Sequence, residues 1–423
     1  MALVSKTFND IITFTRASTG TYFNSSGVLT SAAINTPRLD YDPITLAAHG
    51  LLIEEQRVNS IRNNTMVGAL AGTPGTLPTN WTILGGGLGT LTQQVVGTGT
   101  SNGVNYIDYR VSGTTSTTNF KLSFEQSAQI VAANGQTWAS SAWVSLVGGS
   151  ATNITSNFLS IDGRTAAGAF VGAVNDLSLS GITSTFARYT SVGTIANASV
   201  ERVVLSISIN FNSGVAIDIT LRIGLPQLEL GAFATSVIPT TTVVVTRSAD
   251  VASVNTLSPW YNQPAGTVYA EFMSMVDGSA TQTNGSQGVW STTQSALVSF
   301  NGYGLLTNLT AANSATINFR SRYQPTSKND SVNVGAVSGF LSANTVYKTA
   351  AAWNASEIAA DSDVGALATT TNNAAVDMGL HNQMTLGNQN IGGSSPYQLN
   401  GWLRRIDYYP RRLSDAELQA ITT

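Results

Sequence analysis

The stretch 203–223, VVLSISINFNSGVAIDITLRI, carries the pattern that decides the fold. Residues 217–223 alternate strictly between apolar and polar side chains, which is the two-residue period of a half-buried β-strand. Residues 203–209 form a second run rich in β-branched residues, and Asn212, Ser213 and Gly214 between the runs are turn formers. The sequence therefore predicts two strands joined by a turn.

The same pattern of short apolar or alternating runs recurs along most of the chain. In the region 61–245 the further runs are 105–111, 120–124, 137–147 and 186–191. In the region 251–423 the predicted strands include 266–275, 296–300, 315–322 and 345–353. Because turn formers separate these runs and a sustained helical period is lacking in 61–245, the fold class is predicted to be all-β.

Composition excludes several classes of protein. The 423 residues include no cysteine, two histidines and only 10% charged residues, and the net charge is -3. The absence of cysteine excludes disulfide scaffolds, thiolate metal sites and cysteine nucleophiles. A chain so poor in cations is not a phosphate-reading nucleic-acid binder. No apolar run reaches the length of a transmembrane helix, and the N-terminus lacks the apolar core of a secretory signal.

Three segments are expected. Residues 1–60 form a hairpin-rich attachment or junction segment, residues 61–245 a jelly roll, and residues 251–423 a second β-sandwich. Ser414 and Glu417 have the spacing of a capping box and predict a short C-terminal helix. Deleting residues 1–60 is expected to leave both β modules folded while abolishing assembly.

Charged residues gather in the first segment, although the chain as a whole is nearly neutral. Arginine forks match carboxylates in bidentate pairs, so such a cluster predicts a structural junction between segments or between subunits. Its members are Arg16, Arg38, Asp40, Asp42, Glu54 and Arg57.

Residues that could carry chemistry give only general alternatives. His49 and His381 stand in loop contexts without a nucleophile elbow, and solvated loop histidines are the simpler interpretation. Asp40 with Asp42, and Asp361 with Asp363, could offer oxygens to Ca²⁺, but the simpler interpretation is a structural turn. A pair of carboxylates for glycoside cleavage cannot be selected from 23 acidic residues.

Aromatic residues supply candidates for stacking on sugars. A tryptophan in a sandwich strand is more often a core residue than a ligand platform, and the sequence does not choose among them. The candidates considered are Trp138, Trp143, Trp260, Trp290, Trp353 and Trp402. No carbohydrate-binding, catalytic or metal-binding residue and no cofactor is predicted.

Three groups of motifs resemble known proteins. FTRASTGTY at 14–22, PRLDYDP at 37–43 and GLLIEEQRVN at 50–59 resemble the N-terminal motif of a family of tailed-bacteriophage virion proteins. GLPQLELGAFATSVIP at 224–239 is similar to the closing strand of carbohydrate-binding jelly-roll modules in such proteins, except that Val237 stands where an aromatic residue is expected. LRRIDYYPRRLSDAEL at 403–418 resembles the last strand and helix of concanavalin-A-like, laminin-G-like domains.

The resemblance implies a non-enzymatic structural protein of a bacteriophage particle, a tail fibre or appendage that contacts host-surface glycans. The alternatives are a capsid decoration or head fibre with a purely structural role, a glycan depolymerase and a bacterial adhesin. The implied partners are other virion proteins, bound through the N-terminal segment, and further copies of the chain in a homotrimer. Without a signal peptide, the expected location is the virion, after synthesis in the host cytoplasm.

Overall fold

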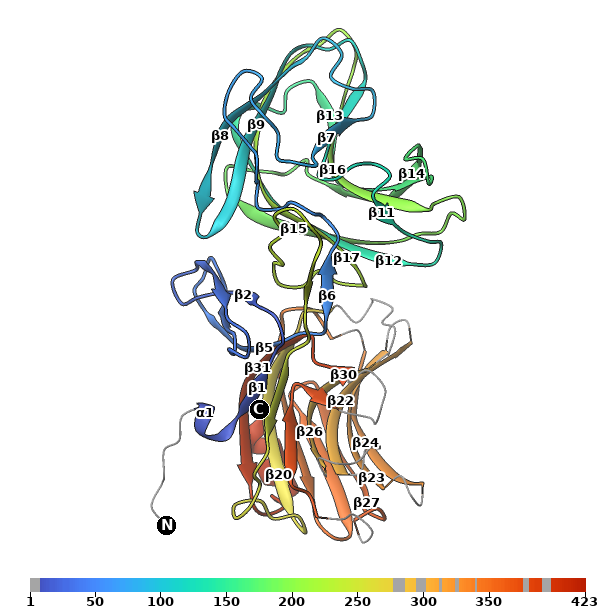
Figure 1. Cartoon of the computed structure of the whole chain (residues 1–423). Coiled ribbons are helices and arrows are strands. Elements are labelled where there is room, and N and C mark those ends of the chain that lie inside the picture. Colours follow the sequence, from blue (N-terminus) through green and yellow to red (C-terminus); the bar gives the residue numbers. More distant parts are fainter. Residues whose placement is uncertain are drawn as a thin grey trace. The chain divides into compact units, whose positions relative to one another are not determined.

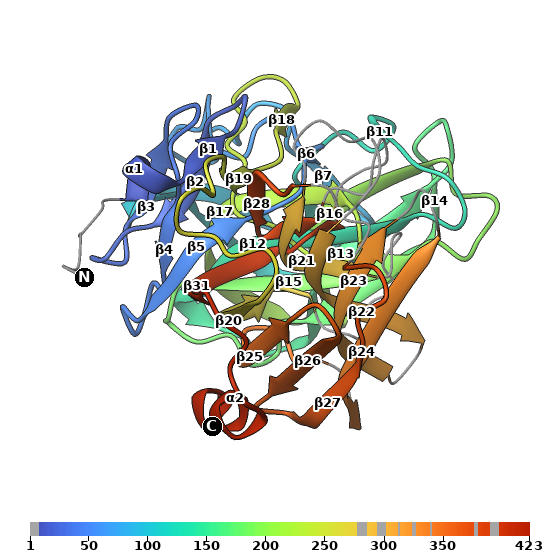
Figure 2. The ribbon, with the colours of Figure 1, turned by 90° about the horizontal axis from the view of Figure 1, so that it is seen from below.

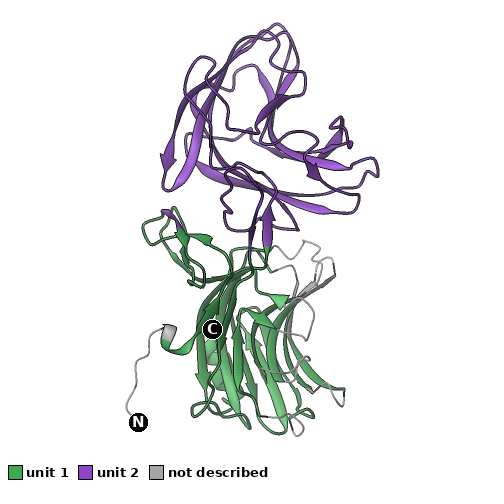
Figure 3. Cartoon of the chain, viewed as in Figure 1, with its two compact units in different colours: residues 1–27, 31–56, 248–423 green, residues 28–30, 57–247 purple. Residues whose placement is uncertain are grey.

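The structure is a computed structural model that describes residues 8–276, 286–293, 302–311, 314–323, 327–338, 341–375, 380–389 and 397–423. The chain forms two compact units (Figure 3). Unit 1 comprises Met1–Gly27, Ser31–Gln56 and Ser248–Thr423, and unit 2 comprises Val28–Thr30 and Arg57–Arg247. The predicted strand at 296–300 lies outside the described residues.

Unit 2 is a sandwich of two antiparallel sheets (Figure 1). The order of the six-stranded sheet is β14-β13-β16-β10-β7, with β11 also paired to β16, and that of the five-stranded sheet is β15-β12-β17-β9-β8. The strands of the first sheet are β7 (Thr82–Leu84), β10 (Asn119–Ser123), β11 (Ile130–Val131), β13 (Ile154–Arg164), β14 (Phe170–Ser178) and β16 (Arg202–Phe211). Those of the second are β8 (Thr92–Ser101), β9 (Val104–Thr114), β12 (Thr137–Ser150), β15 (Ala187–Thr194) and β17 (Ala216–Leu230).

The core of unit 2 follows from the alternation seen in the sequence. The stretch 203–223 forms most of β16 and the start of β17, which belong to different sheets. Leu205 and Ile207 from β16 and Ile219 and Leu221 from β17 are all buried in one hydrophobic cluster. Every second residue of each strand therefore faces the space between the sheets.

A short two-stranded sheet lies at the two ends of the main segment of unit 2. There β6 (Arg57–Asn59) pairs antiparallel with β18 (Val245–Arg247). Arg57 and Arg247 are partners in this register, so the first and last residues of the 57–247 segment lie side by side.

Unit 1 contains two seven-stranded sheets, ordered β1-β19-β28-β21-β22-β23-β24 and β27-β26-β25-β20-β31-β5-β4. The strands of the first are β1 (Thr13–Thr15), β19 (Val251–Val254), β21 (Ser286–Thr293), β22 (Gly302–Ala311), β23 (Ser314–Tyr323), β24 (Lys328–Ser338) and β28 (Gln383–Leu386). Those of the second are β4 (Leu39–Tyr41), β5 (Ala48–Ile53), β20 (Gly266–Ser274), β25 (Val346–Trp353), β26 (Glu357–Ser362), β27 (Gly365–Thr371) and β31 (Gly401–Tyr409). The smaller elements are α1 (Phe8–Ile11), β2 (Gly20–Phe23), β29 (Asn388–Gln389) and β30 (Tyr397–Gln398). The strand β3 (Leu29–Ala32) begins in unit 2 with Leu29 and Thr30 and ends in unit 1.

The two large sheets of unit 1 enclose a second hydrophobic core. The alternation of side chains along β20 shows which residues enter this core. Val268, Ala270 and Phe272 are buried between the sheets, as the alternation in 266–275 predicts. Tyr269, on the other face of β20, belongs to a smaller cluster that includes Leu418 of α2 (Asp415–Thr422).

The predicted C-terminal helix is confirmed. The Ser414 side chain accepts a hydrogen bond from the Glu417 backbone N–H, and the Glu417 side chain accepts one from the Ser414 N–H, so the capping box is complete. Figure 2 shows α2 beside β25, β26 and β27.

Most of the first 56 residues belong to unit 1 and supply strands to its sheets. The sequence analysis treats residues 1–60 as a separate segment, whereas β1 pairs with β19, and β5 lies between β31 and β4. The predicted hairpin is present as β2 and β3, with Gly27 at a φ of 69° in its turn.

The predicted all-β fold class, with a jelly roll, a concanavalin-A-like sandwich and a short C-terminal helix, is confirmed by these sheets. Within the described ranges, no helix has the length and hydropathy needed to cross a membrane.

Candidate functional site

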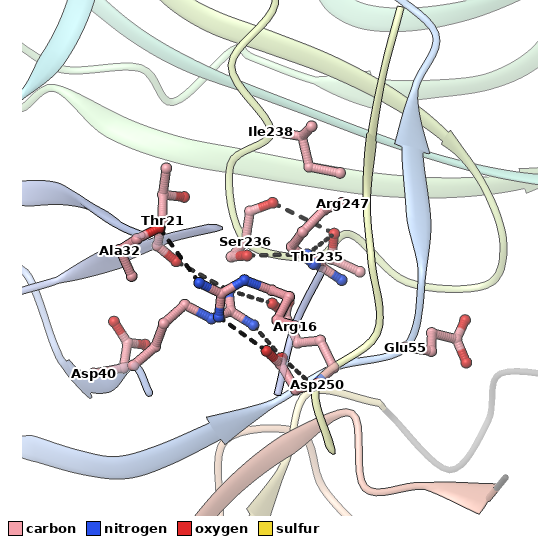
Figure 4. Close-up of polar contacts among 12 residues, drawn as sticks. Arg16, Thr21, Ala32, Asp40, Glu55, Thr235, Ser236, Ile238, Arg247 and Asp250 are labelled. Atoms are coloured by element: carbon pink, nitrogen blue, oxygen red, sulfur yellow. Dashed lines mark hydrogen bonds and ion pairs between the residues drawn. The ribbon is translucent and has the colours of Figure 1, made fainter. Parts of the chain in front are cut away.

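Three of the predicted junction residues meet in a buried charge network in unit 1. Arg16 Nη1 lies 3.1 Å from Asp250 Oδ1, and Arg38 Nη1 lies 2.7 Å from Glu54 Oε2. Arg38 also forms an ion pair with Asp250, whose Oδ2 accepts a hydrogen bond of 2.9 Å from the Glu54 backbone N–H. All four side chains are fully buried, and Figure 4 shows Arg16 directed at Asp250. Asp250, which the sequence analysis did not select, joins the other three.

The arginines of the network also bind backbone groups of unit 1. Arg16 Nη2 donates to the carbonyl oxygen of Ala33 at 2.8 Å, and its Nε donates to that of Ser18 at 2.9 Å. Burial by itself would lower the pKa of Arg38, but the charges of Glu54 and Asp250 outweigh burial and raise it above its ordinary value. The two arginines and two carboxylates bind one another inside the unit, which suits a structural role better than ligand binding.

Asp40 joins two strands by hydrogen bonds. Its Oδ1 accepts a bond of 2.7 Å from the Phe23 backbone N–H, and its Oδ2 accepts one of 2.8 Å from Trp402 Nε1. Because Trp402 lies on β31 and Asp40 on β4, the carboxylate links strands that are not neighbours in the sheet.

The other two predicted junction residues have separate local contacts. Asp42 caps the turn that follows it; burial would raise its pKa, but hydrogen bonds from Thr45 and Ile44 outweigh burial and lower it. Arg57 belongs to unit 2, where it donates to the Leu230 carbonyl oxygen and its Cζ lies 4.6 Å from the ring centroid of Phe233.

The calcium alternative finds no ligand cluster in the described part of the chain. There, no three residues among His, Asp and Glu are grouped so that they could hold a metal ion. Asp361 accepts a hydrogen bond of 2.6 Å from the Thr422 hydroxyl of α2.

His381 is buried, so the interpretation of it as a solvated loop residue is wrong. It is 3% exposed, its Nδ1 lies 3.0 Å from the Tyr261 hydroxyl, and its ring meets that of Tyr303 edge-on. Burial lowers the pKa of His381 to about 4, so the ring is neutral at physiological pH. His49 is half-buried, with its ring centroid 4.8 Å from that of Trp402.

The buried His381 makes unit 1 sensitive to acid. In the unfolded chain a histidine takes up a proton below about pH 6.5, whereas folded His381 resists protonation until about pH 4. Stability from this residue is thus fully present above pH 6.5 and falls by roughly 3 kcal/mol as the pH drops towards 4. Thermal unfolding of the wild type and of His381→Gln at several pH values should show a smaller loss between pH 6.5 and 4 in the variant. Equal losses would contradict the assignment.

Among the tryptophans, the structure selects one as a possible platform. Six of the seven are buried, whereas Trp260 is 37% exposed. Its ring packs edge-on against Tyr408 and Tyr261 at centroid distances of 5.2 and 6.2 Å. Trp260 is therefore a supported aromatic side chain on the surface of unit 1.

The outer face of the six-stranded sheet of unit 2 has a floor of small hydroxyl side chains. Ser123, Ser206 and Ser160 are partners in register across β10, β16 and β13, and their strand neighbours belong to the hydrophobic core. The three serines therefore face away from that core. All three serines are fully buried, so larger side chains cover them.

Charged side chains converge over this floor. Asp162 Oδ1 lies 2.6 Å from Lys121 Nζ, and Asp162 Oδ2 lies 2.9 Å from Arg164 Nη2. The Ser160 hydroxyl contacts Asp162 Oδ1 at 2.9 Å and also contacts Asp176. Asp162 is fully buried, whereas Asp176 is exposed. We define the Asp162 patch as Lys121, Ser160, Asp162, Arg164, Phe170 and Asp176.

Phe170 is the aromatic member of the Asp162 patch. It is 55% exposed, which is unusual for so large an apolar side chain. Lys121 Nζ lies 4.9 Å and Arg164 Cζ lies 5.3 Å from its ring centroid. These cation–π contacts hold the ring beside the charges and leave more than half of the residue open to a ligand.

The sequence gives little signal for the Asp162 patch. Alternation in 119–123 predicts that Lys121 points away from the core, but Asp162 is 41 residues further along the chain. Their contact depends on the pairing of β16 with both β10 and β13, which no local pattern shows.

The outer face of the five-stranded sheet is also charged, and its arginines and aspartates pair across neighbouring strands. Arg222 binds Asp108 through two hydrogen bonds of 2.8 and 3.0 Å, and its Cζ lies 3.7 Å from the ring centroid of Tyr106. Arg110 binds Asp218 in the same bidentate manner. This is the usual arrangement of cross-strand ion pairs on a solvated sheet, and it provides a control surface.

Comparison with known proteins finds similar solved structures but assigns the chain to no family. No family model matches the chain, and no curated protein matches it. One similar solved structure is the CBM40 of a Ruminococcus gnavus IT-sialidase, with 16% identity over 38% of this chain and 84% of that chain and a TM-score of 0.31. Domains LG4-5 of the mouse laminin alpha1 chain match with 10% identity over 71% of this chain and 88% of that chain, with a TM-score of 0.27. The CBM22 tandem domain of Paenibacillus barcinonensis Xyn10C matches with 10% identity over 81% of this chain and 99% of that chain, with a TM-score of 0.24. At these TM-scores the fold class stands on the sheets of the chain itself.

Proposed function

We propose that the chain is a non-enzymatic structural protein of a bacteriophage particle that binds host-surface glycans through the Asp162 patch of unit 2. The observation that carries the glycan proposal is the exposed Phe170 ring held beside the Asp162 charge cluster. The phage role is supported by the motifs at 14–22, 37–43 and 50–59.

The chemistry of the patch suits a sugar. The apolar face of a sugar ring stacks on an aromatic side chain, while its hydroxyl groups need both donors and acceptors nearby. Asp176 supplies acceptor oxygens at the exposed side of the patch, whereas Lys121 and Arg164 are mostly buried against Asp162 and hold the Phe170 ring in place.

In this proposal the protein resides in the virion as a tail fibre or appendage, after synthesis in the host cytoplasm. The N-terminal segment attaches it to other virion proteins, and the chain assembles as a homotrimer. A capsid decoration or head fibre with a purely structural role is the alternative location. Immunogold labelling of intact particles distinguishes head from tail.

Removing the aromatic ring should weaken glycan binding about fivefold, because a stacking contact contributes on the order of 1 kcal/mol. The variants are Phe170→Ala and Arg164→Gln, measured by glycan array and then by calorimetry with the best ligand. The matched control is Arg110→Gln on the five-stranded sheet, which should bind like the wild type. Glycan binding unaffected by both patch variants would place the site elsewhere, with Trp260→Ala as the next variant.

One observation favours an enzymatic alternative, a glycan depolymerase. Asp162 and Asp176 both contact the Ser160 hydroxyl, so two carboxyl groups lie close together in the patch. Glycoside cleavage uses two carboxyl groups that both reach the sugar, and of this pair Asp176 is exposed while Asp162 is buried. Release of reducing ends from host polysaccharide, lost in Asp176→Asn, would support this alternative over simple binding.

A further inference from the structure

Lys121 and Asp162 hold an amine against a carboxyl group in a buried part of unit 2. Lys121 Nζ lies 2.6 Å from Asp162 Oδ1, and the two side chains are 13% and 0% exposed. In the ion pair between Arg110 and Asp218 on the other sheet, the side chains are 39% and 49% exposed. A lysine amine is a nucleophile once it gives up a proton, whereas an arginine keeps its charge. The Asp162 patch therefore contains a nucleophile in contact with a group that it can attack.

The surroundings of this pair favour a neutral product. An amide formed from the two groups carries no charge, so its formation removes two charges from a site that water hardly reaches. Two groups held in contact also react as if each were present at a very high concentration, because the entropy of bringing them together is already lost on folding. Condensation, which is unfavourable between a free amine and a free carboxylate in water, is thus favoured here.

A hydroxyl and a second acid beside the pair provide a path for protons. The Ser160 hydroxyl contacts Asp162 Oδ1 at 2.9 Å and also contacts Asp176 Oδ1. Because a hydroxyl has one proton, it donates to only one of these oxygens, and the other contact is a hydrogen bond only when a carboxyl group brings a proton. Ser160 and Asp176 are register partners on β13 and β14, which fixes this arrangement. Asp162 Oδ1 therefore lies where it can be protonated and leave as water.

The other oxygen of Asp162 has a cation beside it. Arg164 Nη2 lies 2.9 Å from Asp162 Oδ2, and the Arg164 side chain is 6% exposed. When an amine attacks the carboxyl carbon, negative charge develops on the oxygen that does not leave. Arg164 is placed to stabilise that charge on Oδ2, while Ser160 serves Oδ1.

We propose that Lys121 and Asp162 condense into an intramolecular amide bond that cross-links β10 to β13. The Nζ–Cγ bond forms and the Cγ–Oδ1 bond breaks. Of the three protons of the lysine ammonium, one stays on the amide nitrogen and two leave with Oδ1 as one water molecule, so atoms and charge balance without a co-reactant. Oδ2 becomes the amide oxygen beside Arg164.

The cross-link gives unit 2 a covalent tie across its six-stranded sheet. β10 and β13 are not neighbours, because each pairs with β16 between them. The bond closes a loop between residues 41 positions apart, which lowers the entropy of the unfolded chain as a disulfide does. The chain has no cysteine and so no disulfide. The inference goes beyond the proposed function, since glycan binding uses the exposed Phe170 and Asp176 and does not require the bond.

The test is mass spectrometry of the denatured full chain, followed by tryptic peptide mapping. The wild type should be lighter than its sequence by one water, and the peptides that contain residues 121 and 162 should be joined. Lys121→Arg keeps a cation beside Asp162 but cannot form the amide, so it should have the full mass of its sequence. The matched control is Lys348→Arg, because Lys348 Nζ donates to the Thr423 carbonyl oxygen and not to a side-chain carboxylate. This control should stay lighter by one water.

Asp176 acts through Ser160 and is therefore a positioning residue with a test of its own. Asp176→Asn should leave most molecules at the full mass, whereas Asp176→Glu, which keeps a carboxylic acid, should restore the joined peptides. Circular dichroism of both variants should show the same β spectrum as the wild type, which separates loss of the bond from loss of the fold.

Two results would overturn the proposal. One is a folded wild type that keeps the full mass of its sequence after prolonged incubation, which would leave Lys121 and Asp162 as an ordinary buried ion pair. The other is a mass deficit that persists in Lys121→Arg, which would assign the bond to another pair of residues. Neither result bears on glycan binding, which is measured separately with Phe170→Ala.

Discussion

Replacing Asp250 with alanine should unfold unit 1 at temperatures where the wild type is stable. The substitution leaves Arg16 and Arg38 fully buried without the carboxylate they share, and it removes the acceptor of the Glu54 backbone N–H. Breaking a buried ion pair by removing one partner costs about 3–5 kcal/mol, because the other charge remains desolvated. A domain has only about 5–15 kcal/mol of stability in total.

The measurement for Asp250→Ala is calorimetric unfolding of the full chain. The transition of unit 1 should move to a much lower temperature, while that of unit 2 stays in place. Asp218→Ala, which removes the carboxylate of an exposed ion pair with Arg110, should shift neither transition appreciably. A unit 1 transition that is the same in Asp250→Ala and in the wild type would mean that the buried network contributes nothing.

Deleting residues 1–56 should prevent unit 1 from folding. The deletion removes β1, β4 and β5, together with Leu51 and Ile53 of the core and the network arginines. Each fully buried aliphatic side chain contributes roughly 1.5–3 kcal/mol, so the loss approaches the whole stability of the unit. This reverses the expectation from the sequence that both β modules stay folded without the segment.

Fragments of the chain provide controls for the deletion of residues 1–56. Residues 57–247 alone should give a soluble, cooperatively unfolding protein, because unit 2 has its own core. Residues 248–423 alone should be sensitive to proteolysis, and the full chain with 57–247 replaced by a short linker should retain the unit 1 transition. A folded 248–423 fragment would contradict the role assigned to β5 and Asp250.

Local patterns predicted the elements of the fold better than their partners. Alternation in 217–223 and 266–275 is confirmed in β17 and β20, and Ser414 with Glu417 is confirmed as a capping box, because each depends only on neighbours along the chain. The insertion of β5 beside β31 depends on contacts between residues 51–53 and 401–403, which no local period records.

In the candidate sites too, local sequence patterns predicted single residues but not the long-range contacts between them. The charge cluster of the first segment was visible in composition, but Asp250, about 200 residues from Glu54, was not linked to it. In the Asp162 patch, Phe170 has nothing in its sequence context to distinguish it from a core phenylalanine. Only the pairing of β13 with β14 and β16 brings it near Lys121 and Arg164.

The pairing of β6 with β18 bears on how the gene can change. Arg57 and Arg247 are register partners, so the chain leaves unit 1 and returns to it at two points about 5 Å apart. A recombination event that exchanges the coding segment between these points delivers a different module with adjacent ends into an unaltered host sandwich. Under the proposed function, glycan recognition by unit 2 is thus inherited separately from the β1, β4 and β5 strands of unit 1, and a lineage acquires a new binding range in one genetic step.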